Sequence, residues 1–536
     1  MAEPLTESAV WRRLEWHRAE IGHFHLRDLL IDDPSRGDRL TAEGAGLSLD
    51  YSKHLVTDDT LELLRRLATE RGLAERTSAM FRGEAVNVSE GRPALHVALR
   101  MPRSRSLVVD GVDVVKEVHE ELDRMSAFAT RVRDTGAIRN VVNLGIGGSD
   151  LGPAMAYEAL RPFTTRDLSF RFVANVDPSD LARATADLDA AETLFVVVSK
   201  TMTTLETITN ARAAREWVEG RIGGDASAHF VGVTASVEAA EALGIPRQQV
   251  FHMWDWVGGR TSLCSAVGIS VLLALGDAGF RELLAGFHAM DEHFASALLG
   301  ANMPAIAGLL AVWYRNFHDA ESTAVVPYAH PLRLLPAYLQ QLEMESLGKR
   351  VREDGEPVDV DTGAVLWGAE GTNAQHAVFQ LLHQGTALVP LDLVVFAQPT
   401  EGPRERHDLL AANAFAQAEA LALGRSADEL REAGVPEETI PHRVMPGNRP
   451  TSVLLGQRLT PFALGALVAL YEHRVFTEAA VSGIDPFDQW GVELGKELAA
   501  RIAPELEPGW KRELLHDPST NALIRRYRRL RGHAAD

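Results

Sequence analysis

The chain has 536 residues, of which 46% are hydrophobic and 24% charged, and its net charge is −20 at pH 7. This length is too great for one hydrophobic core, so we expect two large domains. The acidic balance argues against nucleic acid as a partner, because a phosphate backbone needs a basic face, and no apolar run reaches the length of a membrane span.

The first hundred residues read as mainly helical, for example at residues 60–71 and 93–100. Beyond them, apolar runs typical of buried strands alternate with helical stretches, which predicts parallel strands with crossover helices and an α/β fold. These runs lie at residues 141–144, 193–198, 229–234, 322–326, 364–367 and 388–396. Residues 276–279, which include two glycines, interrupt the helical pattern and suggest a boundary between two α/β units near residues 275–285. A last helix with an arginine-rich face is expected to begin at Asp517.

Cysteine usage and the start of the chain bear on the compartment. Cys264 is the one cysteine, which excludes an intrachain disulfide and is typical of a reducing cytoplasm. Residues 1–7 lack the basic-then-apolar order of a signal peptide. We therefore expect a cytoplasmic protein.

A glycine-rich segment at residues 144–152 follows the first strand. Glycines there let the backbone approach a ligand, and a following helix directs N–H groups at an anion. The segment is not a dinucleotide fingerprint, because Asp150 stands where a glycine is needed, and it is not a Walker loop. A tight turn without a ligand is the alternative.

A hydroxyl-rich segment at residues 199–207 follows the second strand and includes Ser199, Lys200, Thr201 and Thr204. Hydroxyls and helix N–H groups both donate to phosphate oxygens, so this turn suits a phosphate without a metal. The alternative is a helix cap, but one cap needs only one hydroxyl.

Two further segments carry charged groups suited to proton transfer. Arg260 follows two glycines, and a guanidinium held at such a turn suits a developing oxyanion; the alternative is a pair with an aspartate. Glu345 supplies a carboxylate base for carbon acid chemistry, although its i,i+4 spacing to Lys349 also fits an ordinary helical ion pair.

Histidines and a C-terminal decamer complete the candidates. His376 and His383 are seven residues apart, on one face of an expected helix; we assign His383 to a structural role, whereas His376 lies near a helix start and could face a cleft. Residues 487–496 combine Gln489, an indole and Lys496 with two glycines that a helix would avoid. No spacing suits metal ligands, so neither a metal nor another cofactor is expected.

These segments, in this order, resemble those of glucose-6-phosphate isomerases, the glycolytic aldose–ketose isomerases. The resemblance covers nearly the whole chain and extends to residues 50–53, 95–100 and 407–410. The decamer and the two glycines before Arg260 are its most specific motifs.

The resemblance implies two sugar-isomerase subdomains in a cytoplasmic homodimer that binds a sugar phosphate. Its domains would be a helical N-terminal segment at 1–100, a small subdomain at 101–280, a large subdomain at 281–496 and a C-terminal arm at 497–536. It implies catalysis by Glu345 as the base moving a proton between C1 and C2 through a cis-enediol, by Arg260 at the enediolate, and by His376 from the partner subunit with Lys496 in ring opening. It implies substrate contacts at Gly148, Ser149, Ser199, the backbone of Lys200, Thr201, Thr204, Gln341 and Gln489.

Four positions depart from the family pattern: Thr261 replaces an aromatic residue, Leu347 an asparagine, Glu370 a proline and Ala374 a glycine. These changes affect the shape of the pocket and remove no group from the chemistry. Two rival classes of protein remain. A non-catalytic regulator of the same fold predicts loss of the catalytic side chains, and all four are present. An amidotransferase needs an N-terminal cysteine nucleophile, and Cys264 is the only cysteine.

Overall fold

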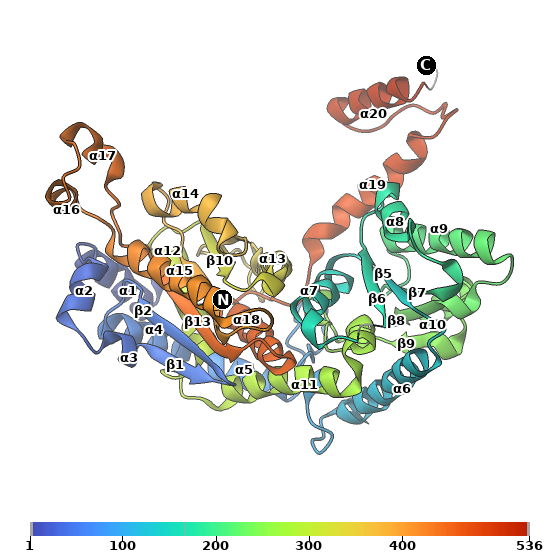
Figure 1. Cartoon of the computed structure of the whole chain (residues 1–536), viewed down its shortest axis with the longest axis horizontal. Coiled ribbons are helices and arrows are strands. Elements are labelled where there is room, and N and C mark those ends of the chain that lie inside the picture. The colour runs from blue at the N-terminus through green and yellow to red at the C-terminus, as the bar shows by residue number, and fades with distance from the viewer. Residues whose placement is uncertain (1–3, 166, 533–536) are drawn as a thin grey trace. The chain divides into compact units, whose positions relative to one another are not determined.

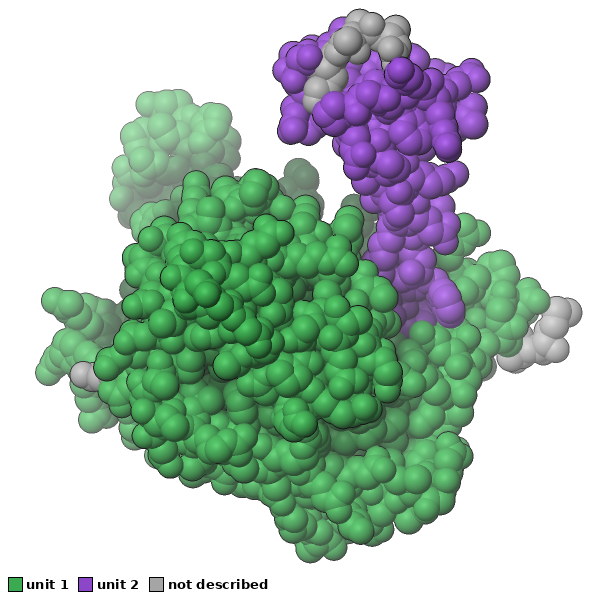
Figure 2. Space-filling model, turned by 90° about the vertical axis from the view of Figure 1, so that its right-hand side faces the viewer, with its two compact units in different colours: residues 1–487 green, residues 488–536 purple. Residues whose placement is uncertain are grey.

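The computed structural model describes residues 4–165 and 167–532, which form two compact units, residues 1–487 and residues 488–536 (Figure 2). Part of the N-terminal segment without a signal-peptide pattern, residues 1–3, lies outside the described residues. Each unit is described by itself.

Unit 1 holds all the strands of the described chain: β1 Thr41–Gly44, β2 Leu47–Lys53, β3 Val108–Val109, β4 Val112–Asp113, β5 Asn140–Leu144, β6 Ser169–Val173, β7 Thr193–Val198, β8 Phe230–Thr234, β9 Val250–His252, β10 Ser322–Pro327, β11 Val365–Gly368, β12 Leu391–Gln398 and β13 Thr451–Arg458. Its α-helices are α1 Ala9–Glu20, α2 Leu26–Asp32, α3 Arg36–Arg39, α4 Asp58–Glu70, α5 Leu73–Phe81, α6 Val114–Thr135, α7 Leu151–Ala159, α8 Pro178–Thr185, α9 Leu205–Ile222, α10 Val237–Ala242, α11 Ile269–Ser296, α12 Met303–Phe317, α13 Leu335–Leu347, α14 Phe379–Gln384, α15 Arg404–Leu423, α16 Ala427–Glu432, α17 Ile440–Arg443 and α18 Pro461–Ser482. The six predicted strands are confirmed, with small differences at their ends.

The first large sheet has five strands in the order β6-β5-β7-β8-β9, and all neighbours run parallel (Figure 1). Every residue of β7 is buried, as expected for a central strand covered on both faces. Helix α9 packs on β5 and β7, and α6 packs on β9. The chain reverses its direction of progress across the sheet between β5 and β7, which is where open α/β sheets bind ligands.

The second large sheet has six strands in the order β1-β2-β13-β12-β10-β11. Its last four strands are mutually parallel, and the hairpin β1–β2 adds antiparallel to the edge of β13. The α/β prediction with parallel sheets flanked by helices is therefore confirmed. The prediction of a mainly helical N-terminal segment missed this hairpin, whose position depends on its pairing with a strand about 400 residues further along the chain.

Other helix predictions for the first hundred residues have mixed outcomes. The helix expected at residues 60–71 is confirmed by α4, whose N-cap Thr57 accepts a hydrogen bond from the N–H of Thr60. The helix expected at residues 93–100 is wrong, because only Ala98–Arg100 forms a 3₁₀ turn. The N–H of Leu95 instead donates to the carbonyl of Trp256 at 3.2 Å, which ties this segment to a loop rather than to a helical turn.

Two long helices fill the core between the sheets. Helix α11 packs on α6 and on α18, so it connects the surroundings of both sheets. It bends at Gly276, whose φ of 76° is one that glycine adopts without strain, within the predicted boundary region at residues 275–285. Helix α18 is buried along nearly its whole length. The domain boundaries at residues 100, 280 and 496 stay predictions.

Unit 2 contains the 3₁₀ turn η13 Trp490–Val492, α19 Glu493–Glu505 and α20 Pro518–Leu530. The predicted start of the last helix is confirmed, because the Asp517 carboxylate accepts from the N–H groups of Ser519 at 2.9 Å and Thr520 at 3.1 Å. In the described parts of the two units, no helix combines the length and the apolar character needed to cross a membrane.

Candidate active site

Both loops at the reversal point of the five-stranded sheet come from predicted segments. The glycine segment follows β5 and forms the 3₁₀ turn η3 Gly147–Ser149 before α7, and the hydroxyl segment follows β7 and leads into α9. Because β5 and β7 are neighbouring parallel strands, these loops leave the same edge of the sheet. The structure therefore brings Ser149 and Ser199 to one edge.

The hydroxyl segment has more donors than a helix cap uses. The Oγ of Ser199 lies 3.0 Å from Oγ1 of Thr204, and Oγ1 of Thr201 lies 2.6 Å from Oγ1 of Thr203. Thr204 is the N-cap residue of α9, yet its side chain accepts no capping hydrogen bond. The first turn of α9 therefore keeps N–H groups that can donate hydrogen bonds to an anion.

Lys200 links the hydroxyl segment to the arginine segment. Its Nζ donates to the carbonyls of Asp255 at 2.7 Å and Val257 at 3.1 Å. Burial, with a smaller contribution from nearby Arg92, lowers the pKa of Lys200 to about 8. The ammonium is thus engaged with backbone, which agrees with the expectation that this residue offers its backbone rather than its side chain to a ligand.

Glycine is required where the glycine loop meets the arginine loop, η8 Gly259–Thr261. A Cβ at Gly148 would lie 2.0 Å from the carbonyl oxygen of Gly259, so any larger residue would push the two loops apart. Gly147 has a φ of 59°, and a Cβ there would lie 3.1 Å from Nε2 of Gln341. These close approaches hold Gly148, Arg260 and Gln341 in one region.

Arg260 is 3% exposed and is held from several sides. Its Nε donates to Oγ of Ser346 at 2.6 Å, its Nη1 donates to Oε1 of Glu345 at 3.1 Å, and its Nη2 donates to the carbonyl of Pro486. Tyr338 donates its hydroxyl to the Arg260 carbonyl at 3.1 Å. A guanidinium fixed in this way cannot swing away from the carboxylate beside it.

Glu345 lies in the last turn of α13, between Arg260 and Gln341. Its Oε2 accepts a hydrogen bond of 2.8 Å from Nε2 of Gln341, and Oε1 of Gln341, although buried, has no partner among the described residues. Helix α13 ends at Leu347, so Lys349 lies beyond the helix. The cation shown to contact Glu345 is Arg260, which lies in the 3₁₀ turn η8 after β9.

The histidine prediction is partly wrong. His376 ends the 3₁₀ turn η11 Asn373–His376, whereas His383 lies in the separate helix α14, so the two do not share one helical face. His383 has the structural surroundings expected of it, with Nε2 2.8 Å from Oε1 of Gln417. His376 is exposed, and within residues 4–165 and 167–532 it takes part in no hydrogen bond or ion pair. The structure therefore does not join it to Glu345 within one chain.

Gln489 and Lys496 belong to unit 2. Gln489 precedes η13, and Lys496 lies in α19 with Nζ 2.9 Å from Oε1 of Glu493. Its side chain is 64% exposed. The predicted decamer thus spans the end of unit 1 and the beginning of unit 2.

Ser346 is the site residue that sequence analysis missed. It follows Glu345 directly, and a hydroxyl beside a proposed base was a signal that could have been used.

Of the four departures from the family pattern, Leu347 and Ala374 are buried, and Thr261 donates to the carbonyl of Gly258 at 3.3 Å.

Glu370 replaces the proline of the family pattern and holds the loop that carries His376. Its Oε2 lies 2.6 Å from Nδ1 of His330, and its Oε1 accepts from Nδ2 of Asn373 at 3.0 Å. No group of three or more histidine, cysteine or acidic side chains in the described residues is arranged to hold a metal ion.

Known proteins resemble the chain over nearly its whole length. A model of the phosphoglucose isomerase family matches residues 50–524. The glucose-6-phosphate isomerase of Anaeromyxobacter sp. (strain K) is 58% identical over 99% of both chains, and that of Deinococcus deserti is 56% identical over 99% of this chain and 100% of its own. The crystal structure of a glucose-6-phosphate isomerase from Chlamydia trachomatis superposes with a TM-score of 0.88 at 32% identity, covering 98% of this chain and 100% of that one.

The fold and these similarities define the class of enzyme, that of aldose–ketose isomerases. The chain belongs to the phosphoglucose isomerase family, whose reaction is the interconversion of glucose 6-phosphate and fructose 6-phosphate. The resemblance predicted from the motifs is therefore confirmed.

Proposed function

We propose that Glu345 and Arg260 perform the proton transfer of this interconversion, at a site that holds the substrate phosphate on the loops after β5 and β7. The observation that carries the proposal is the contact of a partly exposed carboxylate with a buried, fixed guanidinium, 3.1 Å apart. Measuring the conversion of fructose 6-phosphate with a coupled assay, with mannose 6-phosphate as competitor, tests the reaction and its substrate preference.

Glu345 acts as the base. In the open-chain aldose it takes the proton from C2. The electron pair left behind forms the C1–C2 double bond while the π pair of the C1 carbonyl moves onto O1, which gives an enediolate. When the proton returns to C1, the hydroxyl proton of O2 passes to O1 and the carbonyl forms at C2, which gives the ketose. The hydrogen bond from Gln341 and the ion pair with Arg260 orient the carboxylate for this transfer.

Arg260 stabilises the negative charge of the enediolate. Its guanidinium is buried and fixed by Ser346 and the Pro486 carbonyl, so it requires little reorganisation when charge develops. The phosphate is held at Gly148, Ser149, Ser199, the Lys200 backbone, Thr201 and Thr204. An anchored phosphate lets remote binding energy position C1 and C2.

Ring opening is assigned to His376 and Lys496, with Gln341 and Gln489 as further substrate contacts. For His376, Lys496 and Gln489 this assignment rests on the family resemblance.

We propose that the enzyme is a homodimer and that His376 enters the site of the partner subunit. The exposure of His376, and its lack of a partner in the described chain, support a role outside its own subunit.

Mixed dimers test this shared site. One chain carries His376→Ala and the other Glu345→Gln, so that both homodimers are inactive. In a two-fold symmetric mixed dimer, one site receives both intact groups and the other site both defects, so about half of the wild-type activity should return. An inactive, verified mixed dimer would show that both groups come from one chain, while the isomerase assignment would stand.

The reaction belongs to glycolysis and gluconeogenesis, and we assign the enzyme to the cytoplasm. Its one thiol, Cys264, is buried, and burial raises its pKa to about 12, so it is unreactive at neutral pH.

We expect no requirement for a metal or another cofactor. Activity that disappears with a chelator and returns with one specific metal would contradict this.

A further inference from the structure

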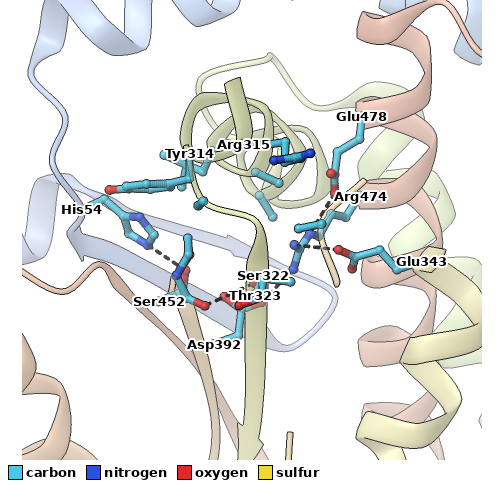
Figure 3. A pocket seen from close by; sticks show the side chains of 16 residues that line it. His54, Tyr314, Arg315, Ser322, Thr323, Glu343, Asp392, Ser452, Arg474 and Glu478 are labelled. Atoms are coloured by element: carbon cyan, nitrogen blue, oxygen red, sulfur yellow. Dashed lines mark hydrogen bonds and ion pairs between the residues drawn. The ribbon is translucent and has the colours of Figure 1, made fainter. Parts of the chain in front are cut away.

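A cavity lies at the opposite edge of the six-stranded sheet, away from the loop that carries His376. It is lined by residues at the amino ends of three parallel strands, Ser322 of β10, Asp392 of β12 and Ser452 of β13, and by α12, α13 and α18 (Figure 3). The phosphate loops proposed above follow the carboxyl ends of β5 and β7, whereas this cavity lies at the amino ends of β10, β12 and β13, and neither Arg260 nor Glu345 lines it. It is therefore a separate cavity.

Three carboxylates in this cavity surround one guanidinium. Arg474 donates from Nε to Glu478 at 3.1 Å, from Nη1 to Asp392 at 2.9 Å and from Nη2 to Glu343 at 3.5 Å (Figure 3). The side chains of Glu343, Arg474 and Glu478 are 2%, 5% and 8% exposed. The cluster therefore has more negative than positive charge in a place with little water, which is unfavourable without a further cation.

Hydrogen-bond acceptors also outnumber donors. Each contact of Arg474 uses one oxygen of a carboxylate, and Tyr471 donates at 3.2 Å to the same Asp392 oxygen that Arg474 contacts. Within the described chain no group donates to the second oxygen of Glu343, Asp392 or Glu478. Arg315, at the cavity wall, is directed to the Thr362 carbonyl and to Asp361 instead.

An independent observation comes from His54, on the other side of the cavity. Its imidazole is 2% exposed and points into the cavity beside Ser452, whose Oγ lies 2.9 Å from Nε2 (Figure 3). Nδ1 has no partner among the described residues. Burial lowers the pKa of His54 to about 3, so the ring is neutral and Nδ1 accepts a hydrogen bond when Nε2–H donates to Ser452. In that tautomer Nδ1 is a buried acceptor without a donor, which is expensive and again indicates a missing donor.

We propose that this cavity binds a small primary ammonium ion, whose N–H groups donate to the unused carboxylate oxygens of Glu343 and Glu478. The positive charge balances the cluster, and several N–H donors match its excess of acceptors. The cavity measures about 40 Å³ for the centres of water-sized atoms. Since one water needs roughly 10–15 Å³ on this measure, the ligand is limited to a few heavy atoms.

The first experiment compares three chloride salts at equal ionic strength by thermal unfolding of the full-length protein. Methylammonium should raise the melting temperature in a saturable way, as a ligand of the folded state does. Tetramethylammonium has the same charge without N–H donors, and potassium has charge alone, so neither should do so. Equal responses to all three salts would overturn the proposal, and this comparison needs no variant.

The second experiment uses a pair of matched variants. At pH 9, where Glu478 is ionised, Glu478→Gln should raise the half-saturating methylammonium concentration about tenfold or more, because it weakens one charge-assisted hydrogen bond. Glu472→Gln is the control: it lies on the same helix, is equally buried and pairs with Arg100 instead. An unchanged response in Glu478→Gln, or an equal loss in both variants, would contradict the assignment.

The pH dependence of binding gives a third readout. Burial and repulsion by Glu343 raise the pKa of Glu478 to about 8, and burial also raises the pKa of Glu343, against the opposing charge of Arg474. A proton therefore competes with the ammonium ion, and binding should tighten about tenfold between pH 7 and pH 9. Tighter binding at pH 7 would refute competition at these carboxylates. The measurements follow stability, so their outcome is independent of the isomerase mechanism.

Discussion

The two large sheets of unit 1 differ in the chemistry that they place at the proposed active site. Around the five-stranded sheet, Ser199 and Thr204 offer hydroxyls and helix N–H groups, which bind an anion without reacting with it. Around the six-stranded sheet, Glu345 offers a carboxylate, which can move a proton. Arg260 comes from the first region and contacts the second, at 3.1 Å from Glu345. On the proposed assignment, binding and chemistry belong to separate segments, so substitutions should separate KM from kcat.

Glu345→Gln should produce the largest effect. It removes the base but keeps the shape and a hydrogen-bonding group, so kcat should fall by about 10³-fold or more while affinity for substrate changes little. Calorimetric titration with substrate, beside the coupled assay, measures both. A variant that binds and also turns over at a near wild-type rate would show that the base is another residue.

Arg260→Lys should come next. An ammonium ion replaces the planar guanidinium but cannot make its separate contacts with Glu345, Ser346 and the Pro486 carbonyl. We expect kcat to fall by roughly 10²-fold, in the range found for lost oxyanion donors, with a smaller loss of affinity for a phosphate-bearing inhibitor. Equal losses in kcat and in inhibitor affinity would make Arg260 a ground-state binding residue and would contradict the proposed separation of binding from chemistry.

Ser199→Ala addresses the other side of the comparison. It removes one hydroxyl of the proposed phosphate site and the contact with Thr204. KM should rise by up to about tenfold, the value of one ordinary hydrogen bond, while kcat stays within about threefold. Steady-state kinetics measures both, and a fall in kcat with unchanged KM would place Ser199 in the chemical step.

The smallest expected effect is on the pH dependence of stability, through Glu478 in the cavity at the amino ends of β10, β12 and β13. Because the pKa of Glu478 is raised to about 8, the folded protein binds more protons there than the unfolded chain between pH 4.5 and pH 8. Stability should therefore fall as pH rises through this window. Glu478→Gln cannot lose a proton, so its melting temperature should fall less from pH 5 to pH 8 than that of the wild type. Parallel pH profiles would show that Glu478 does not titrate in this window.

Local sequence patterns predicted much of this fold. Apolar runs such as residues 193–198 predicted buried strands because a strand covered on both faces has no polar side. The β1–β2 hairpin escaped prediction because its stability comes from pairing with β13, not from its own residues. The helix wrongly expected at 93–100 was likewise displaced by a distant contact, that of Leu95 with Trp256.

In the candidate site too, residue types could be recognised from the sequence, whereas contacts between distant segments could not. Spacing alone favoured a Glu345–Lys349 pair, and only the tertiary structure brings Glu345 to Arg260 in a different segment. Residue types alone led us to propose both for catalysis, because proton transfer next to a carbonyl needs a base and a group that stabilises the developing negative charge. The charges around Arg474 could not be predicted, since they meet only where α13, α18 and β12 pack together.

Isotope exchange tests the central claim, that Glu345 moves a proton through an enediol, most directly. The wild-type enzyme and Glu345→Gln are incubated with fructose 6-phosphate in D₂O, and the sugars are analysed by NMR after many turnovers. A carboxylic acid exchanges its proton with solvent, so the wild type should introduce deuterium at C1 of fructose 6-phosphate and at C2 of glucose 6-phosphate, and the variant should introduce almost none. Isomerisation by the wild type without any deuterium, or equal exchange by the variant, would contradict the account.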